Sequence, residues 1–192
     1  MRSQRMLLLW VLILALVIPA AGATAGGPTE QLRTDIDELY RSVTLVGGPS
    51  NGSARAIVDR MFDWTAMAQA ALRDHWQKRT AAERTEFTGL FANLFARAYL
   101  SRINLVDARS FQYLGDATVG DRSTVKTTVL TKRGSTIDVE YVVQGTPAQR
   151  WHVQDVRVES MSLIDNYRVQ FDTVIGKTSY DELVKRLRAA VK

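Results

Sequence analysis

Apolar residues recur at three- and four-residue steps through the first half of the chain, the spacing of helices that bury one face. This pattern predicts helices over residues 32–46, 53–62, 64–72 and 81–99. The first should end at Gly47-Gly48-Pro49. Asn51 or Ser53 is placed to cap the second helix, and Asp63 to cap the third. The fourth is the longest, and it opens with the capping box Thr80-Ala81-Ala82-Glu83.

After Asp107 the apolar period falls to two, which is typical of strands that bury one face. Alternating residues run from Val125 to Thr131 and from Ile137 to Val143, and Gly-containing turns follow both runs. A less regular strand-like stretch surrounds Phe111 and Tyr113. Because the connections are short, we expect an antiparallel meander of about four strands.

The segment from Trp151 to Phe171 combines both periods, and the rest of the chain can be organised around it. Its first part predicts a central strand. The apolar positions of this strand change face partway along, with Trp151 and Val153 on one side and Val156 and Val158 on the other.

From Leu163 onward the spacing becomes helical, and Ser160 or Ser162 is placed to cap this helix. The residues Ser179-Tyr180-Asp181-Glu182 form a second capping box, which opens a last helix. The order of helices, then antiparallel sheet, then two helices indicates an α+β fold.

Residues 1–25 have the pattern of a cleaved signal peptide. Arg2 and Arg5 precede an unbroken apolar run over residues 6–18, Pro19 ends that run, and small residues then fit the cleavage rule. The run is shorter than the roughly 20 residues that a bilayer core of about 30 Å requires. We therefore expect a single domain over residues 26–192, secreted to the periplasm.

Composition and spacing point away from several kinds of chemistry. The chain has no Cys, and removal of the leader lowers its net charge from +5 to +3, without a basic stripe that would track nucleic acid. His75 and His152 are the only histidines, and neither has metal-ligand spacing to a third ligand. A triad of His152 with Asp155 and Ser162 lacks a nucleophile elbow. We predict no catalytic and no metal-binding residue.

The apolar residues allow two interpretations. The helices and the sheet either pack into a filled core or leave a cavity, lined by the same residues, that holds an apolar ligand. Periodicity alone does not separate a filled core from a hollow one.

Three segments carry a family resemblance: FDWTAMAQAALRDHW (62–76), ERTEFTGLFANLFARAYL (83–100) and VQDVRVESMSLIDNYRVQF (153–171). Together they resemble the MlaC/toluene-tolerance family of periplasmic phospholipid-binding proteins, which serve an ABC transport system. The most specific part is the run from Asp155 to Phe171. Arg73 departs from the family pattern, which has Gly at this position before Trp76, and this departure concerns the turn before Trp76.

The resemblance implies a carrier rather than an enzyme. Its α+β fold would enclose an apolar cavity for the acyl chains of a phospholipid, which is cargo, and no cofactor is implied. Arg168 would reach the headgroup. The lining residues that we predict come from the long helix, the meander and the organising segment: Phe91, Leu94, Phe95, Tyr99, Val129, Val139, Tyr141, Val143, Trp151, Met161, Leu163 and Tyr167.

The partners that the resemblance implies are an inner-membrane ABC transporter with its lipid-binding ring subunit and an outer-membrane lipoprotein complex, with transient membrane contact. The implied role is to maintain the lipid asymmetry of the outer membrane. Two alternatives stay open. One is a nuclear-transport-factor-like enzyme for a small apolar substrate, which would need Asp155 beside Tyr141 or His152 inside the cavity. The other is a structural adaptor with a packed core.

Overall fold

The computed structural model describes residues 26–45, 52–146 and 148–191. The leader, the helix stop at Gly47-Gly48-Pro49 and the cap at Asn51 lie outside these ranges. The α-helices are α1 (Pro28–Leu45), α2 (Gly52–Met61), α3 (Trp64–Leu72), α4 (Ala81–Val106), α5 (Leu163–Lys177) and α6 (Tyr180–Ala190). A 3₁₀ helix, η1 (Arg73–Lys78), follows α3, and the strands are β1 (Ala108–Val119), β2 (Arg122–Thr131), β3 (Thr136–Thr146), β4 (Gln149–Val158) and β5 (Met161–Ser162). The predicted α+β fold is confirmed.

The strands pair in chain order, β1-β2-β3-β4-β5, and every pair is antiparallel. The prediction that the Trp151 strand is central was wrong. Each short turn returns to the neighbouring strand, so β4 lies next to the edge, where β5 covers only its last residues. The starts of α3 and α5 cover the rest of β4: Asp63 N donates to Val153 O at 2.9 Å, and Ile164 N donates to Asp155 Oδ1 at 3.2 Å.

A β-bulge explains why the apolar positions of β4 change face in the sequence. On β3, Val142 and Val143 are consecutive, but their partners on β4, Asp155 and Val153, are two residues apart, so Gln154 is an extra residue. The extra residue returns the following apolar positions to the core face. The predicted division between two faces was therefore wrong, and the core side of β4 carries all of its apolar residues: Trp151, Val153, Val156 and Val158.

Helix caps are largely as predicted. Side chains of Asp63, Thr80 and Ser162 each accept a hydrogen bond from a backbone N–H in the following turn. The box at Thr80 is reciprocal, because Glu83 Oε2 accepts from Thr80 N at 2.7 Å. Helix α2 starts at Gly52, which places Ser53 inside its first turn.

The second capping box is only half formed. Ser179 Oγ accepts from Glu182 N at 3.2 Å and caps α6, as predicted. The Glu182 carboxylate does not return to Ser179 but accepts from Arg186 Nε at 2.9 Å. An (i, i+4) arginine on the same helix thus takes the place of the reciprocal bond.

Arg73 ends α3 in a conformation that favours glycine. Its backbone has φ 45° and ψ −113°, and its N–H donates to Gln69 O. A Cβ atom is strained in this region, whereas glycine enters it freely. The chain then turns through η1 and buries Trp76. The turn is present with arginine at the position where the family pattern has glycine.

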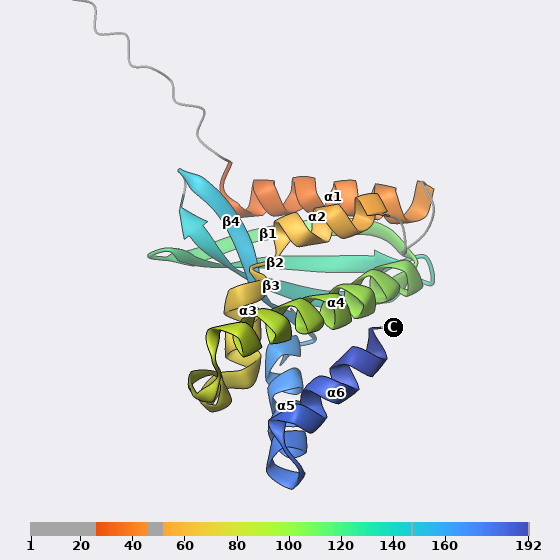
Figure 1. The fold of residues 1–192 in the computed structure, drawn as a ribbon. Coiled ribbons are helices and arrows are strands. Elements are labelled where there is room, and N and C mark those ends of the chain that lie inside the picture. Colours follow the sequence, from red (N-terminus) through yellow and green to blue (C-terminus); the bar gives the residue numbers. More distant parts are fainter. Residues whose placement is uncertain (1–25, 46–51, 147, 192) are drawn as a thin grey trace, which may run out of the picture.

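The helices and the sheet share one core. In Figure 1, α1 and α2 lie along one side of the sheet, α4 crosses the middle of the molecule, and α5 and α6 form a hairpin below α4. Buried apolar side chains from all of these helices and from the core face of the sheet belong to one continuous cluster. Buried Asp35 joins α1 to α2 and β4 through ion pairs with Arg60 and Arg150. Within the described ranges, no helix has the length and apolar character needed to span a membrane.

Candidate functional site

The predicted lining residues from α4, the sheet and α5 come together in the structure. Leu94, Leu163 and Tyr167 are half-buried and pack against the core. The other members are buried: Phe91, Phe95, Tyr99, Val129, Val139, Tyr141, Val143 and Trp151. We call this set the apolar cluster. It lies between the core face of the sheet and the helices, where the sequence analysis placed the cavity.

Aromatic rings run continuously through the apolar cluster. The Phe91 and Phe95 ring centroids are 5.9 Å apart, and Tyr99 continues the row 6.2 Å from Phe95. Tyr167 of α5 crosses this row, with its ring 5.4 Å from Phe91 at an interplanar angle of 87°. Such pairs are worth about 0.5–1.5 kcal/mol each beyond their burial. The rings are in contact, so α4 and α5 are held together by the same residues that were predicted to line a cavity.

Tyr99 and Tyr141 place two hydroxyl groups inside the apolar cluster, where Trp151 Nε1 is a further buried polar atom, without a hydrogen-bond partner in the described ranges. Their Oη atoms are 3.1 Å apart, so one hydroxyl donates to the other. Burial raises the pKa of Tyr141 to about 12 and the pKa of Tyr99 well above its ordinary value. Both side chains are neutral at neutral pH, and their hydroxyls satisfy each other. The surroundings therefore suit hydrocarbon rather than a charged group.

Met161 was also predicted to line the cavity, but it lies outside the apolar cluster. Its side chain is 69% exposed. The chain reverses at Glu159 and Ser160, both with positive φ, and this turn places Met161 in β5 at the sheet edge.

Arg168, the predicted headgroup contact, lies in a cleft of about 190 Å³ between α3, α5 and the outer face of the sheet. Its guanidinium forms an ion pair with Asp165. Arg122 and Arg157 line the same cleft. Arg157 pairs with Glu140 and Asp155, so Arg122 is the cation of this cleft without a carboxylate partner in the described ranges. A charged lining of this kind suits an anionic ligand and not an acyl chain.

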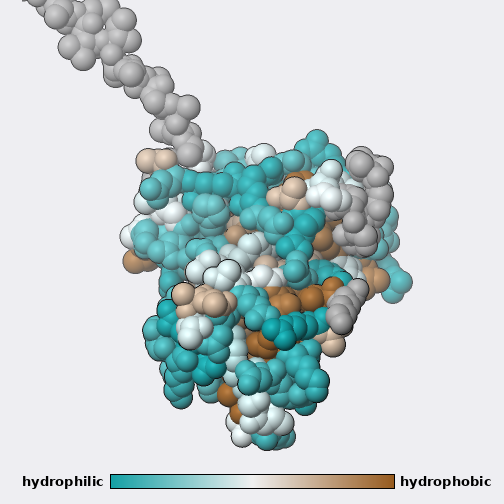
Figure 2. Space-filling model, in the orientation of Figure 1, coloured by the Kyte–Doolittle hydropathy of each residue, from teal (hydrophilic) through white to brown (hydrophobic). Residues whose placement is uncertain are grey.

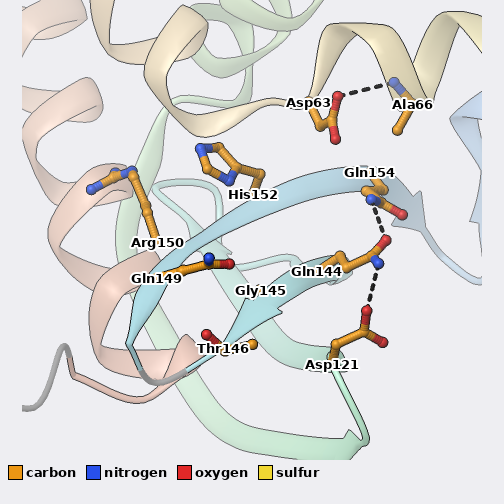
Figure 3. Close-up of a pocket in the computed structure, with 10 residues that line it drawn as sticks. All are labelled: Asp63, Ala66, Asp121, Gln144, Gly145, Thr146, Gln149, Arg150, His152 and Gln154. Carbon is orange, nitrogen blue, oxygen red and sulfur yellow. Dashed lines mark hydrogen bonds between the residues drawn. The ribbon is translucent and has the colours of Figure 1, made fainter.

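A larger cleft, of about 480 Å³, is polar and lies away from the apolar cluster. Figure 3 shows its side chains from β3 and β4 opposite Asp63 and Ala66 at the start of α3. Gln154 Nε2 donates to Gln144 Oε1 at 2.5 Å, and Gln144 Nε2 donates to Asp121 Oδ2 at 2.7 Å. Asp63 is engaged in capping α3. These bonds use the polar groups to join β3, β4 and the β1–β2 turn.

The site required by the enzyme alternative is not assembled. Asp155 pairs with Val142 on the outer side of the sheet and accepts a hydrogen bond from the start of α5. Tyr141, next to Val142 on β3, faces the core and bonds to Tyr99. His152 lines the polar cleft rather than the apolar cluster. Within the ranges that the structure describes, no group of acidic and histidine side chains is arranged to hold a metal ion.

Apolar side chains also reach the surface beside the apolar cluster. On the face shown in Figure 2, apolar surface gathers below α4, toward α5 and α6. Leu90, Leu94 and Ile103 of α4 and Tyr167 of α5 are half-buried and pack against the core, so part of each side chain remains exposed. Hydrocarbon can therefore approach the cluster along the seam between α4 and the α5–α6 hairpin.

Several residues that contact the apolar cluster were not selected from the sequence. Phe87 and Phe171 extend the ring row, with centroids 5.7 Å apart. Phe62 and Trp64 stack at 5.2 Å, and Phe62 lies 5.4 Å from Phe95. Phe87 and Phe171 lie on the predicted apolar helix faces, so periodicity could have identified them. The position of Phe62 depends on its bridge to Val153 of β4, which helical periodicity does not reveal.

Comparisons with known proteins agree with this fold. The model of the MlaC protein family matches residues 51–189. A solved structure, the phospholipid-binding protein from Ralstonia solanacearum in complex with a phospholipid, aligns with a TM-score of 0.69 at 20% sequence identity. The alignment covers 85% of this chain and 96% of that chain. No curated protein sequence matches the chain. At this identity the structural likeness establishes the fold.

Proposed function

This chain belongs to the MlaC protein family, and from that premise we propose that it binds a phospholipid by its acyl chains and carries it without catalysing a reaction. One observation carries the proposal: apolar residues selected from the sequence on α4, β2, β3, β4 and α5 meet in a single cluster. The phospholipid found with the Ralstonia protein of the same fold supports the choice of ligand.

Binding must replace contacts within the apolar cluster. Each buried CH₂ group contributes about 0.8 kcal/mol, so two chains of about sixteen carbons represent about 25 kcal/mol gross. The aromatic pairs that now join α4 to α5 are worth about 0.5–1.5 kcal/mol each. Acyl chains that take over these contacts can offset the cost of separating α4 and α5 from the sheet. The seam below α4 is the route that the exposed apolar surface favours.

The headgroup would remain near solvent. Arg168 is the contact that we propose for its phosphate, with Arg122 and Arg157 in the same cleft. Because the guanidinium of Arg168 already pairs with Asp165, a phosphate would have to compete with that carboxylate.

The remaining parts of the proposal concern the route of the cargo. We propose that residues 1–25 are removed as a signal peptide and that residues 26–192 act in the periplasm as one domain. The carrier would exchange phospholipid between an inner-membrane ABC transporter with its ring subunit and an outer-membrane lipoprotein complex. Such exchange would maintain the lipid asymmetry of the outer membrane.

The most direct test is the phospholipid content of the purified protein, measured by extraction and mass spectrometry. We expect Leu94→Arg to lower this content several-fold, because a half-buried position in the cluster can accept an arginine that reaches solvent. Val143→Arg is less informative, since Val143 is 2% exposed and an unpaired buried charge would unfold the protein.

Leu114→Arg is the matched control, because Leu114 is 64% exposed on β1. It should keep the wild-type phospholipid content. A wild-type protein without phospholipid, or equal content in the Leu94 and Leu114 variants, would contradict the proposal.

A further inference from the structure

An exposed leucine stands at the C-terminal end of α4. Leu105 is 75% exposed in the last turn of the helix, whereas its neighbour Val106 packs against the core. Asp107, in the left-handed conformation, ends the helix and leads directly into β1. The helix end thus projects a single large apolar side chain into solvent.

Several cationic residues lie close to Leu105 in the chain or at the adjoining turn. Arg102 precedes it by three residues on the same helix face, and Arg109 follows at the start of β1. The β2–β3 turn lies against this junction, because Lys132 N donates to Asp107 O at 3.0 Å. That turn adds Lys132 and Arg133. We call Arg102, Leu105, Arg109, Lys132 and Arg133 the cationic tip. In Figure 1 the end of α4 and the β2–β3 turn meet at the right of the molecule.

The cations of the tip are largely uncompensated. The guanidinium groups of four arginines in the described ranges have neither an ion pair nor a hydrogen bond, and three of these arginines belong to the tip: Arg102, Arg109 and Arg133. The fourth is Arg122. Only Lys132 is paired, with Asp107 at 2.5 Å. The distribution of unpaired arginines is therefore uneven, although the net charge of the whole chain is modest.

The opposite end of the sheet shows that an exposed apolar residue need not be surrounded by cations. Val119 at the β1–β2 turn is 83% exposed, but Asp116 and Asp121 lie three and two residues away from it in the chain. Thr29 and Thr118 donate to Asp116, and Gln144 donates to Asp121. Val119 thus provides an apolar residue of similar exposure with two acidic neighbours in the chain and one arginine, its cross-strand partner Arg122.

The cationic tip adjoins the apolar cluster. Arg102 is close enough to Tyr167 for its charge to oppose the rise in the pKa of that phenol, a rise that burial causes. Ile103, next to Arg102, packs against the core. Through Arg102 the tip lies near Tyr167, which is a half-buried member of the apolar cluster.

We propose that the cationic tip docks the protein on the surface of an anionic phospholipid bilayer, with Leu105 entering the interface. The inference rests on the proposed carrier function and adds the docking site to it. Unpaired arginines next to an exposed leucine complement a negatively charged surface that has an apolar interior, and arginine or lysine near such a surface strengthens binding about fivefold per side chain. Docking in this orientation brings the cluster close to the source of its cargo.

Co-sedimentation with vesicles tests the docking site. Wild-type protein should partition onto vesicles of phosphatidylcholine with about 30 mol% phosphatidylglycerol, and much less onto pure phosphatidylcholine. The double variant Arg109→Gln/Arg133→Gln should partition about 25-fold more weakly, at about fivefold for each cation. Leu105→Gln should also weaken partitioning, whereas the matched control Val119→Gln should not. Raising the salt to about 1 M, where the Debye length is about 3 Å, should release the wild-type protein.

The outcomes separate this inference from the proposed function. Wild-type protein that contains phospholipid but does not sediment with the anionic vesicles would overturn the docking site alone. Equal partitioning of the tip variants and Val119→Gln would also overturn it. Weaker sedimentation of the tip variants, at unchanged phospholipid content and thermal unfolding, would support it. Vesicle binding by a protein that never contains phospholipid would instead overturn the proposed carrier function.

Discussion

Replacing Arg73 with glycine should stabilise this protein. Arg73 has φ 45° and ψ −113°, and a non-glycine residue in such a sparsely populated region costs about 1–3 kcal/mol. Glycine removes this strain but raises the entropy of the unfolded chain, which costs about 0.4–1 kcal/mol. The ion pair that would be lost is weak, because Arg73 Nε lies 3.8 Å from Asp74 Oδ1 and both side chains are mostly exposed.

The net expectation is a gain of about 1 kcal/mol in the free energy of unfolding, which for a domain of this size raises Tm by about 2–4 °C. Urea unfolding of lipid-free protein is the assay, because bound lipid would add its own stabilisation. The midpoint should rise at an unchanged m-value.

Arg73→Ala is the control for this prediction. It removes the ion pair but keeps a Cβ atom in the strained conformation, so its midpoint should stay near the wild-type value. If Arg73→Gly and Arg73→Ala unfold at the same urea concentration, the backbone conformation does not store the proposed strain.

Three further predictions concern the sheet and its buried tyrosines. Tyr141→Phe should lower the free energy of unfolding by about 1–3 kcal/mol, because the buried Tyr99 hydroxyl loses its hydrogen-bond partner. In a double-mutant cycle measured by urea unfolding, the variant with Phe at both positions should recover part of the lost stability. Burial raises the pKa of both tyrosines above their unfolded value of about 10. The stability that they contribute is therefore complete below pH 10 and is lost as pH rises toward 12. If the variant with Phe at both positions loses stability as steeply as the wild type over this pH range, the two tyrosines are not the cause of the loss. Gly145→Ala should destabilise by about 1–3 kcal/mol, since its Cβ would lie 2.7 Å from Arg150 O, whereas Gly176→Ala in open space on α5 should not; thermal unfolding of both variants measures the difference.

The features that the sequence predicts well depend on near neighbours in the chain. The caps at Asp63, Thr80 and Ser162 are decided by a side chain and an N–H at most three residues away, so the local pattern was sufficient. The meander follows from short turns between alternating runs in the same way. Only half of the Ser179 box formed, because Arg186, one turn further on, competes for Glu182.

The features that were not predicted depend on residues far away in the chain. The bulge at Gln154 is defined only by the pairing with β3, so the sequence of β4 alone places apolar residues on both faces of the strand. Likewise, periodicity predicted that Phe91, Tyr141 and Tyr167 face the same interior. The distances between them depend on how closely α4 and α5 approach the sheet, which periodicity does not give. Volume, unlike the apolar pattern, is a property of the assembled layers.

The reversal of the chain at Glu159 and Ser160 determines how α5 is rotated about its own axis. Glu159 N donates to Asp138 O at 2.9 Å, and this hydrogen bond fixes the turn to the start of β3. Only three residues then separate Glu159 from the start of α5 at Leu163. An α-helix advances by about 100° per residue, so deleting one residue here would rotate the ring of Tyr167 by more than a quarter of a revolution, away from Phe91. The number of residues in this one connection therefore determines which side chains α5 presents to α4 and to the core.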